Sequence, residues 1–179
     1  MMMQKFVALL RGINVGGNKK IPMAELRKVL EKTGLKNVKT LLASGNVVFE
    51  TDSSKIDELQ SSISSVIERA FKFQVPVLLR SFPEIQKLIA LDPFKQITVT
   101  PQIRMYVTFL SEKVKDKASS NYVSLDKSFR ILSKSKTEIF SVLDLSKTGT
   151  SEAMSALEKE FGKEITTRNW NTILKIAGL

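Results

Sequence analysis

One order of predicted strands and helices, βαββαβ, occurs twice along this chain, and it restricts the possible folds more than any other feature. The first half predicts a buried strand (KFVALLRG, 5–12), followed by a helix that begins at Pro22 and ends at Gly34. Two strands then follow, over 39–43 and 46–50, joined by a turn at Ser44-Gly45. A helix from Ile56 and a strand over 75–80 complete this half. This order is typical of ferredoxin-like split βαβ units.

The second half repeats the order more loosely. It predicts a strand over 103–110, a polar helix over 112–120, a hairpin around 135–137, a helix over 150–161 and a last strand over 163–167. We therefore expect an α+β protein with two tandem ferredoxin-like units, antiparallel sheets and a C-terminal helix. The units would span 1–90 and 102–179, and residues 91–101 would form a linker after a short helix near Pro83. One continuous α+β domain with a larger mixed sheet is the alternative.

Histidine and cysteine are both absent from the sequence. Ser-His-Asp and Cys-His mechanisms and ordinary zinc sites are therefore excluded, and we predict no metal site. Catalysis would have to use carboxylates, lysine, tyrosine or hydroxyl groups. The residues do not say whether the protein is an enzyme, and they identify no cofactor.

The net charge of +10 favours anionic partners. The excess is +6 in residues 1–90 and +4 in residues 91–179, so it is not gathered in a tail. No apolar run has the ~18 residues of a membrane span, and the apolar start is too short for a signal peptide. We expect a cytoplasmic protein that does not interact with membranes.

The segment RGINVGGN (11–18) combines charge, amide groups and glycines. The spacing of Gly12 and Gly17 resembles a phosphate-binding P-loop, but the Lys-Ser/Thr that must follow is missing. Arg11, Asn14 and the backbone at Gly16 could still bind an anion, unless the glycines only satisfy a tight loop.

A second polar segment, SGN (44–46), joins two predicted strands. By itself it is typical of a plain turn. In a ferredoxin-like sheet, however, this hairpin and the loop after the first strand lie at the same end. We therefore predict that Ser44 and Asn46 lie beside RGIN and contribute to one ligand site.

The segment TTRNWNT (166–172) predicts the start of the C-terminal helix. Asn169 suits the N-cap, and the residues expected to face inward are Trp170, Ile173, Leu174 and Ala177. Arg168 and Asn171, with Asn169, would bind an anion at the helix start. We expect this segment to pack against the RGIN and SGN end and form a cleft between the two units.

The strand MYVTFL (105–110) is similar to the first-strand motif of RNA-recognition domains. The partner motif, a glycine-and-aromatic octamer on the third strand, is absent, since TEIFSVLD has only Phe140. An ordinary strand explains the segment better.

Three motifs in one order, ALLRGINVGG, SGNVVF and TTRNWNT, resemble the bacterial family called domain of unknown function sixteen ninety-seven. The resemblance runs from the first strand to the last helix, although residues 83–160 contribute little to it. Many relatives have Gln before SGN, where this chain has Ala43. The resemblance implies an α+β bacterial cytosolic protein and brings no activity with it.

Three hypotheses about function follow. The protein binds a small phosphate- or carboxylate-bearing ligand, with or without catalysis, through groups that do not titrate near neutrality. Alternatively, it is a nucleic-acid-binding module, or a structural protein in which the three motifs only hold the domains together. The sequence does not indicate the oligomeric state.

Overall fold

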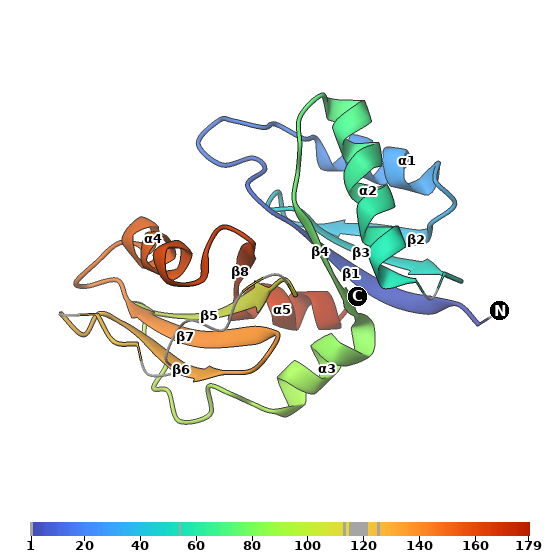
Figure 1. Ribbon diagram of the computed structural model, residues 1–179. Coiled ribbons are helices and arrows are strands. Elements are labelled where there is room, and N and C mark those ends of the chain that lie inside the picture. Colours follow the sequence, from blue (N-terminus) through green and yellow to red (C-terminus); the bar gives the residue numbers. More distant parts are fainter. Residues whose placement is uncertain (1, 54, 113, 115–121, 125) are drawn as a thin grey trace. The chain divides into compact units, whose positions relative to one another are not determined.

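The computed structural model of the chain describes residues 2–53, 55–112, 114, 122–124 and 126–179 (Figure 1). These residues form a mixed α+β structure with two four-stranded antiparallel sheets and five helices. None of the described helices combines the length and the apolar character that a bilayer crossing requires.

The first sheet has the strand order β2-β3-β1-β4. Its elements, in chain order, are β1 (Gln4–Leu10), α1 (Met23–Glu31), β2 (Lys36–Leu41), β3 (Asn46–Thr51), α2 (Ile56–Phe71) and β4 (Val77–Ser81). Strand β1 lies between β3 and β4 and is antiparallel to both, with Leu9 opposite Asn46. The end of β1 is therefore next to the start of β3.

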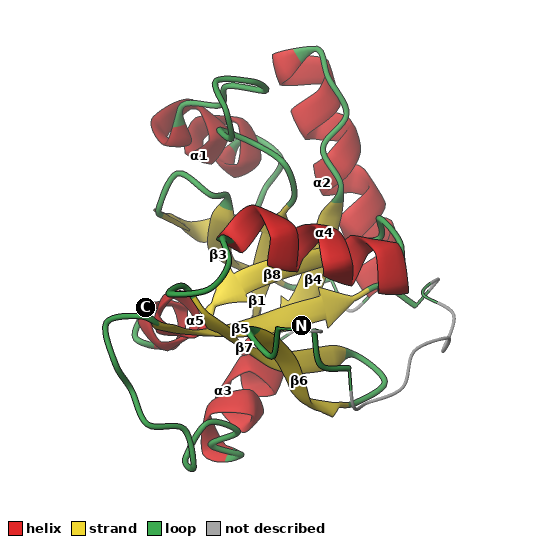
Figure 2. Ribbon diagram, turned by 90° about the vertical axis from the view of Figure 1, so that its left-hand side faces the viewer, coloured by secondary structure: helices red, strands yellow, loops and turns green. Residues whose placement is uncertain are grey.

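Helices α1 and α2 lie on one face of the first sheet (Figure 2). In α2, Leu59, Ile63 and Ile67 recur every four residues and are buried, which explains why this segment forms an amphipathic helix. They pack with Leu26 and Leu30 of α1 and with alternate residues of the strands, such as Phe6, Ala8, Leu10, Val47 and Phe49. This core fixes which side chains of β1 and β3 face away from the helices.

The second sheet has the strand order β6-β7-β5-β8. Its elements are β5 (Ile103–Leu110), β6 (Phe129–Lys134), β7 (Glu138–Asp144), α4 (Thr150–Phe161) and β8 (Ile165–Asn169). Ala153, Leu157 and Phe161 of α4 pack on one face of this sheet, against residues that include Tyr106, Leu110 and Ile139. On the opposite face Phe140 contacts the rings of Phe94 and Trp170. Both faces of β7 are thus covered within this part of the chain.

Each last strand continues directly into a helix. β4 is followed by α3 (Phe82–Ala90), and β8 is followed by α5 (Trp170–Ala177). The chain divides into two compact units, Met1–Lys87 with Ile176–Leu179, and Leu88–Lys175. This division falls inside α3 and α5, whereas the sequence places a linker at 91–101. The expected units 1–90 and 102–179 stay a prediction.

Three details differ from the sequence-based expectations or lie outside what is described. β8 continues to Asn169, so Arg168 belongs to a strand and does not precede a helix in a loop. The predicted inward face of α5 is wrong at Leu174, which is 43% exposed, whereas Thr172 and Ile176 are buried. The polar helix expected over 112–120 lies almost entirely outside the described residues.

Candidate functional site

The RGIN and SGN segments are neighbours at one end of the first sheet. The Leu10 N–H donates a hydrogen bond to the Gly45 carbonyl at 2.8 Å. The Asn14 side chain reaches the same hairpin and donates to the Ala43 carbonyl at 2.8 Å. A third segment joins them, because the Arg11 N–H donates to the Pro76 carbonyl at 2.9 Å just before β4. Three distant parts of the chain thus meet around Arg11.

Asn14 clamps this end of the sheet. Its Nδ2 donates to the Ile21 carbonyl at 3.0 Å as well as to Ala43, and its Oδ1 accepts the Ile21 N–H at 2.8 Å. Its backbone φ is 55°, in the left-handed region that asparagine tolerates better than most residues. Both amide hydrogens are used inside the protein, so Asn14 shapes the loop and has little capacity left for a ligand.

The loop between β1 and α1, drawn in blue in Figure 1, forms a small turn of its own. The Asn18 N–H donates to the Val15 carbonyl at 3.1 Å, and Gly16 and Gly17 have φ values of 58° and 79°. Two consecutive positive φ values are typical of a type I′ turn, which glycine adopts without strain. Lys19 Nζ donates to the Gln74 carbonyl at 2.9 Å and holds the turn to the segment before β4. The loop is therefore a tethered turn, unlike a P-loop, which runs straight into a helix.

The SGN hairpin is tightly packed at its centre. Gly45 has φ 79°, and a Cβ atom there would lie 2.7 Å from both Leu10 Cβ and Ile13 Cδ1. Asn46 is fully buried, and its Nδ2 donates to the Leu41 carbonyl at 2.9 Å and to Ser44 Oγ at 3.1 Å. Asn46 therefore stabilises the hairpin, whereas Ser44 is exposed. The surface of this end offers half-buried Arg11, exposed Ser44, exposed Lys20 and the backbone at Gly16.

Arg168, the basic residue of TTRNWNT, is buried. It lies opposite Val107 in β5, and its Nη1 donates to Thr166 Oγ1 and to the Thr167 carbonyl, both at 3.0 Å. Burial lowers the pKa of its guanidinium to about 10. These two bonds hold the buried side chain against its own strand, and the ligand role expected for Arg168 stays a prediction.

The rest of this segment begins α5. Asn169 Oδ1 accepts the Asn171 N–H at 2.9 Å, which is the hydrogen bond of an N-cap and confirms that prediction. The Trp170 ring lies 5.1 Å from that of Phe94 and 6.5 Å from that of Phe140, between centroids. Trp170 is thus a packing anchor, and Asn171 is the exposed polar side chain of the helix start.

The comparisons with known proteins agree with these motifs. The family described as "Protein of unknown function (DUF1697)" matches residues 3–140, well over half of the chain. The chain belongs to the DUF1697 family. The resemblance carried by ALLRGINVGG and SGNVVF is therefore confirmed, while TTRNWNT lies beyond the matched residues of this DUF1697 protein.

A solved structure with the same overall fold is that of the conserved bacterial protein SP0830 from Streptococcus pneumoniae. It shares 26% sequence identity with this DUF1697 chain at a TM-score of 0.72, and the similarity covers 99% of this chain and 98% of that chain. No curated protein matches the chain. The comparisons thus establish an uncharacterised family and bring no activity with them.

Sequence reasoning missed a counterpart of Arg168 in the first sheet of this DUF1697 protein. Arg80 is the fourth residue of β4, as Arg168 is of β8, and it lies opposite Val7 in β1. It is buried as well, and its Nη1 donates to the Leu79 carbonyl at 2.9 Å. The signal was present as two similar stretches, RSFPEIQK (80–87) and RNWNTILK (168–175). Both begin with Arg, a capping residue and an aromatic ring.

Proposed function

We propose that this protein binds a small phosphate- or carboxylate-bearing ligand at the loop end of its first sheet. The observation that carries the proposal is the convergence of three chain segments around Arg11, held by the bonds from Leu10 to Gly45, from Arg11 to Pro76 and from Asn14 to Ala43. These hydrogen bonds hold the backbone of the three segments in one conformation. The protein therefore loses less conformational entropy when a ligand binds.

The chemistry of the groups at this end suits an anion. A guanidinium offers planar paired donors that match carboxylate and phosphate oxygens, and Arg11 would supply them. The Ser44 hydroxyl and the backbone amides around Gly16 would add neutral donors. A guanidinium, a hydroxyl group and backbone amides all donate hydrogen bonds, so they suit the binding of an anion.

The tandem ferredoxin-like architecture is part of the same proposal. It is supported by the strand orders β2-β3-β1-β4 and β6-β7-β5-β8, which are equivalent when the strands of each sheet are numbered from its first. It is also supported by the paired segments at Arg80 and Arg168. In this architecture the loop after the first strand and the hairpin between the second and third strands share an end, as the proposed site requires.

Nucleic-acid binding on an open sheet is less well supported. Tyr106, the aromatic of MYVTFL, packs in the core beneath α4, and its hydroxyl lies 3.4 Å from Thr150 Oγ1. On the other face, Phe140 is in contact with Phe94 and Trp170. Single-stranded nucleic acids stack on exposed aromatic side chains, and these aromatic residues are buried.

Titration calorimetry with inorganic phosphate and with pyrophosphate, at low and at moderate salt, tests the proposal. Arg11→Gln should weaken binding about tenfold or more, because a charge-assisted pair is lost. Arg69→Gln, which removes an exposed arginine from α2, is the matched control and should leave binding unchanged. Equal affinity in wild type and Arg11→Gln would overturn the proposal. Strong binding of a short RNA that weakens steeply with salt would instead support a nucleic-acid module.

A further inference from the structure

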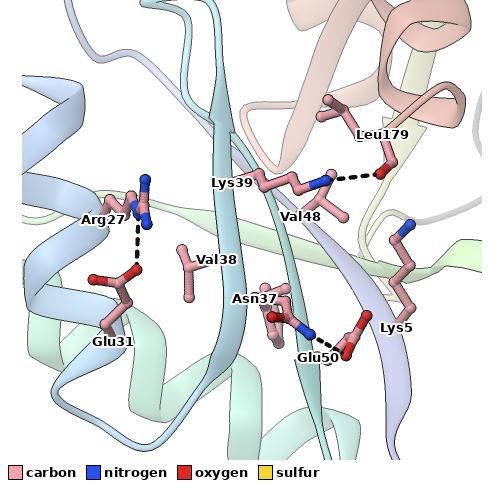
Figure 3. Close-up of a pocket in the computed structure, with 10 residues that line it drawn as sticks. Lys5, Arg27, Glu31, Asn37, Val38, Lys39, Val48, Glu50 and Leu179 are labelled. Carbon is pink, nitrogen blue, oxygen red and sulfur yellow. Dashed lines mark hydrogen bonds and ion pairs between the residues drawn. The ribbon is translucent and has the colours of Figure 1, made fainter.

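A pocket of about 450 Å³ opens at the other end of β1 from Arg11 (Figure 3). Its wall is formed by β1, β2 and β3 and by α1, with Leu179 at its rim. Its volume is within the range of small-molecule sites, ~300–1,000 Å³. No sequence motif marked this region.

A β-bulge in β2 shapes the pocket. Lys36 lies opposite Glu50, and Lys39 lies opposite Val48. Two residues of β2, Asn37 and Val38, therefore lie opposite one residue of β3, Phe49. Asn37 has φ 50°, and its Nδ2 donates to Glu50 Oε2 at 2.7 Å. Bulges redirect side chains and are frequent next to binding sites, where they are designed features of a sheet.

The sheet register places a set of complementary groups on one face. Lys5 lies opposite Glu50, and Val48 lies between Val7 and Lys39 across the sheet. The Cα atoms of Lys5 and Lys39 are two strands and two residues apart, about 12 Å by sheet spacing, so their long side chains can converge on one ligand. Glu50 lies opposite Lys5 on the same face of the sheet.

The Nζ of each lysine carries three donors, so an acidic group can be added to the contact that the lysine already makes. Lys5 Nζ lies 3.9 Å from the centroid of the Phe82 ring, and Lys39 Nζ donates to the Leu179 main-chain oxygen at 3.1 Å. Within the described residues neither lysine forms an ion pair with Asp or Glu, in contrast to Arg27, which pairs with Glu31 at 2.8 Å. The contact with Leu179 shows that an oxygen acceptor reaches Lys39 (Figure 3).

We propose that this pocket binds a small carboxylate carrying an amino or hydroxyl group, such as an amino acid or a hydroxy acid. Lys5 and Lys39 hold the carboxylate, and Glu50 accepts a hydrogen bond from the amino or hydroxyl group. The site is independent of the anion site at Arg11, because the two lie beyond opposite ends of β1.

NMR titration of the labelled protein with L-alanine, L-lactate, acetate and ethylamine tests the inference. Shifts should map to β1, β2 and β3 around Lys5, Lys39 and Glu50, with alanine and lactate binding more tightly than acetate and ethylamine not binding. Lys39→Gln and Lys5→Gln should each weaken binding about tenfold. Glu50→Gln should remove the preference over acetate while acetate still binds.

One control separates this site from general charge effects. Lys28→Gln replaces an exposed lysine of α1 outside the pocket, and this variant should bind alanine and lactate like the wild type. The inference is overturned if none of the probes shifts pocket resonances, or if Lys28→Gln weakens binding as much as Lys39→Gln. It is also overturned if ethylamine binds as well as alanine.

Discussion

Replacing Gly45 by alanine tests how tightly the loop end of the first sheet is held. Two costs are expected. Gly45 has φ 79°, and an L-residue in a left-handed conformation costs about 1–2 kcal/mol. The added Cβ would also lie 2.7 Å from Leu10 Cβ, which belongs to a central strand and cannot rotate away. Overpacking of this kind costs about 1–3 kcal/mol, so Gly45→Ala should lose about 2–5 kcal/mol in total.

Gly34→Ala is the matched control, because it shares the first cost and lacks the second. Gly34 has φ 94°, but a Cβ there would meet no atom within 4 Å. Its loss should therefore be about 1–2 kcal/mol. Urea unfolding followed by circular dichroism, with m-values compared among wild type and both variants, gives the two free energies of unfolding.

The difference between the two variants decides the result. If Gly45→Ala lowers the free energy of unfolding no more than Gly34→Ala does, Gly45 is not closely packed against Leu10 and Ile13. The inference that the segments around Arg11 are held rigidly would then be contradicted. If the packing is right, Gly45→Ala should also weaken phosphate binding more than Gly34→Ala does, since displacing Leu10 moves its neighbour Arg11.

Three further predictions concern the second sheet. Trp170→Ala should lower the free energy of unfolding by about 3–5 kcal/mol, because it leaves a cavity against two phenylalanine rings; a loss below 1 kcal/mol in urea unfolding would contradict this. Ser141 Oγ is buried and has no hydrogen-bond partner among the described residues, so Ser141→Ala should stabilise the protein by about 1 kcal/mol, whereas a clear loss in thermal unfolding would reveal a partner. Hydrogen bonds from Ser124 and Ser128 lower the pKa of Asp126 to about 2. Its contribution to stability is therefore present above pH 3.8 and is lost as the pH falls towards 2. The difference in free energy of unfolding between wild type and Asp126→Asn should disappear over that range. A difference that stays constant with pH would refute this prediction.

Much of the fold could be predicted from apolar spacing alone. The pattern of Leu59, Ile63 and Ile67 identified α2, and the apolar runs on either side of Ser44-Gly45 identified the hairpin. These signals work because each element buries one face, and burial imposes a period on the sequence. The neighbourhood of RGIN and SGN followed from strand direction, and the structure shows it.

The features that the sequence did not reveal have physical causes. In α5, residues 173, 174 and 176 are all apolar, so the sequence is compatible with more than one buried face. In the structure Ile173 and Ile176 are buried and Leu174 is exposed. The last strand was predicted to end at residue 167 because the sequence that follows is polar, but β8 continues through Arg168 to Asn169. At Asn14 the sequence shows an amide without showing that both its hydrogens are already donated. The pocket at Asn37 depends on a β-bulge, which leaves no pattern in the sequence.

A comparison of Arg80 with Arg168 distinguishes the residues of TTRNWNT that have a structural role from those that are free to bind a ligand. Arg80 occupies the same strand position as Arg168 and makes the same bond to the preceding carbonyl, and the Ser81 Oγ after it accepts the Glu84 N–H at the start of α3. Buried arginine, capping residue and aromatic ring are thus features of how a strand passes into a helix in both units. Asn171 is different, because its counterpart is Pro83 and its side chain is exposed.

Asn171 is therefore the residue of the C-terminal motif whose presence is not explained by a role in the strand-to-helix junction. Asn171→Ala should change the free energy of unfolding by less than about 0.5 kcal/mol, as expected for an exposed side chain. Asn169→Ala should cost about 1 kcal/mol through the lost N-cap. Phosphate titration of both variants then separates the roles, since weaker binding by Asn171→Ala at unchanged stability would assign the motif a ligand. Wild-type binding by Asn171→Ala would leave TTRNWNT with the same structural role as the segment at Arg80.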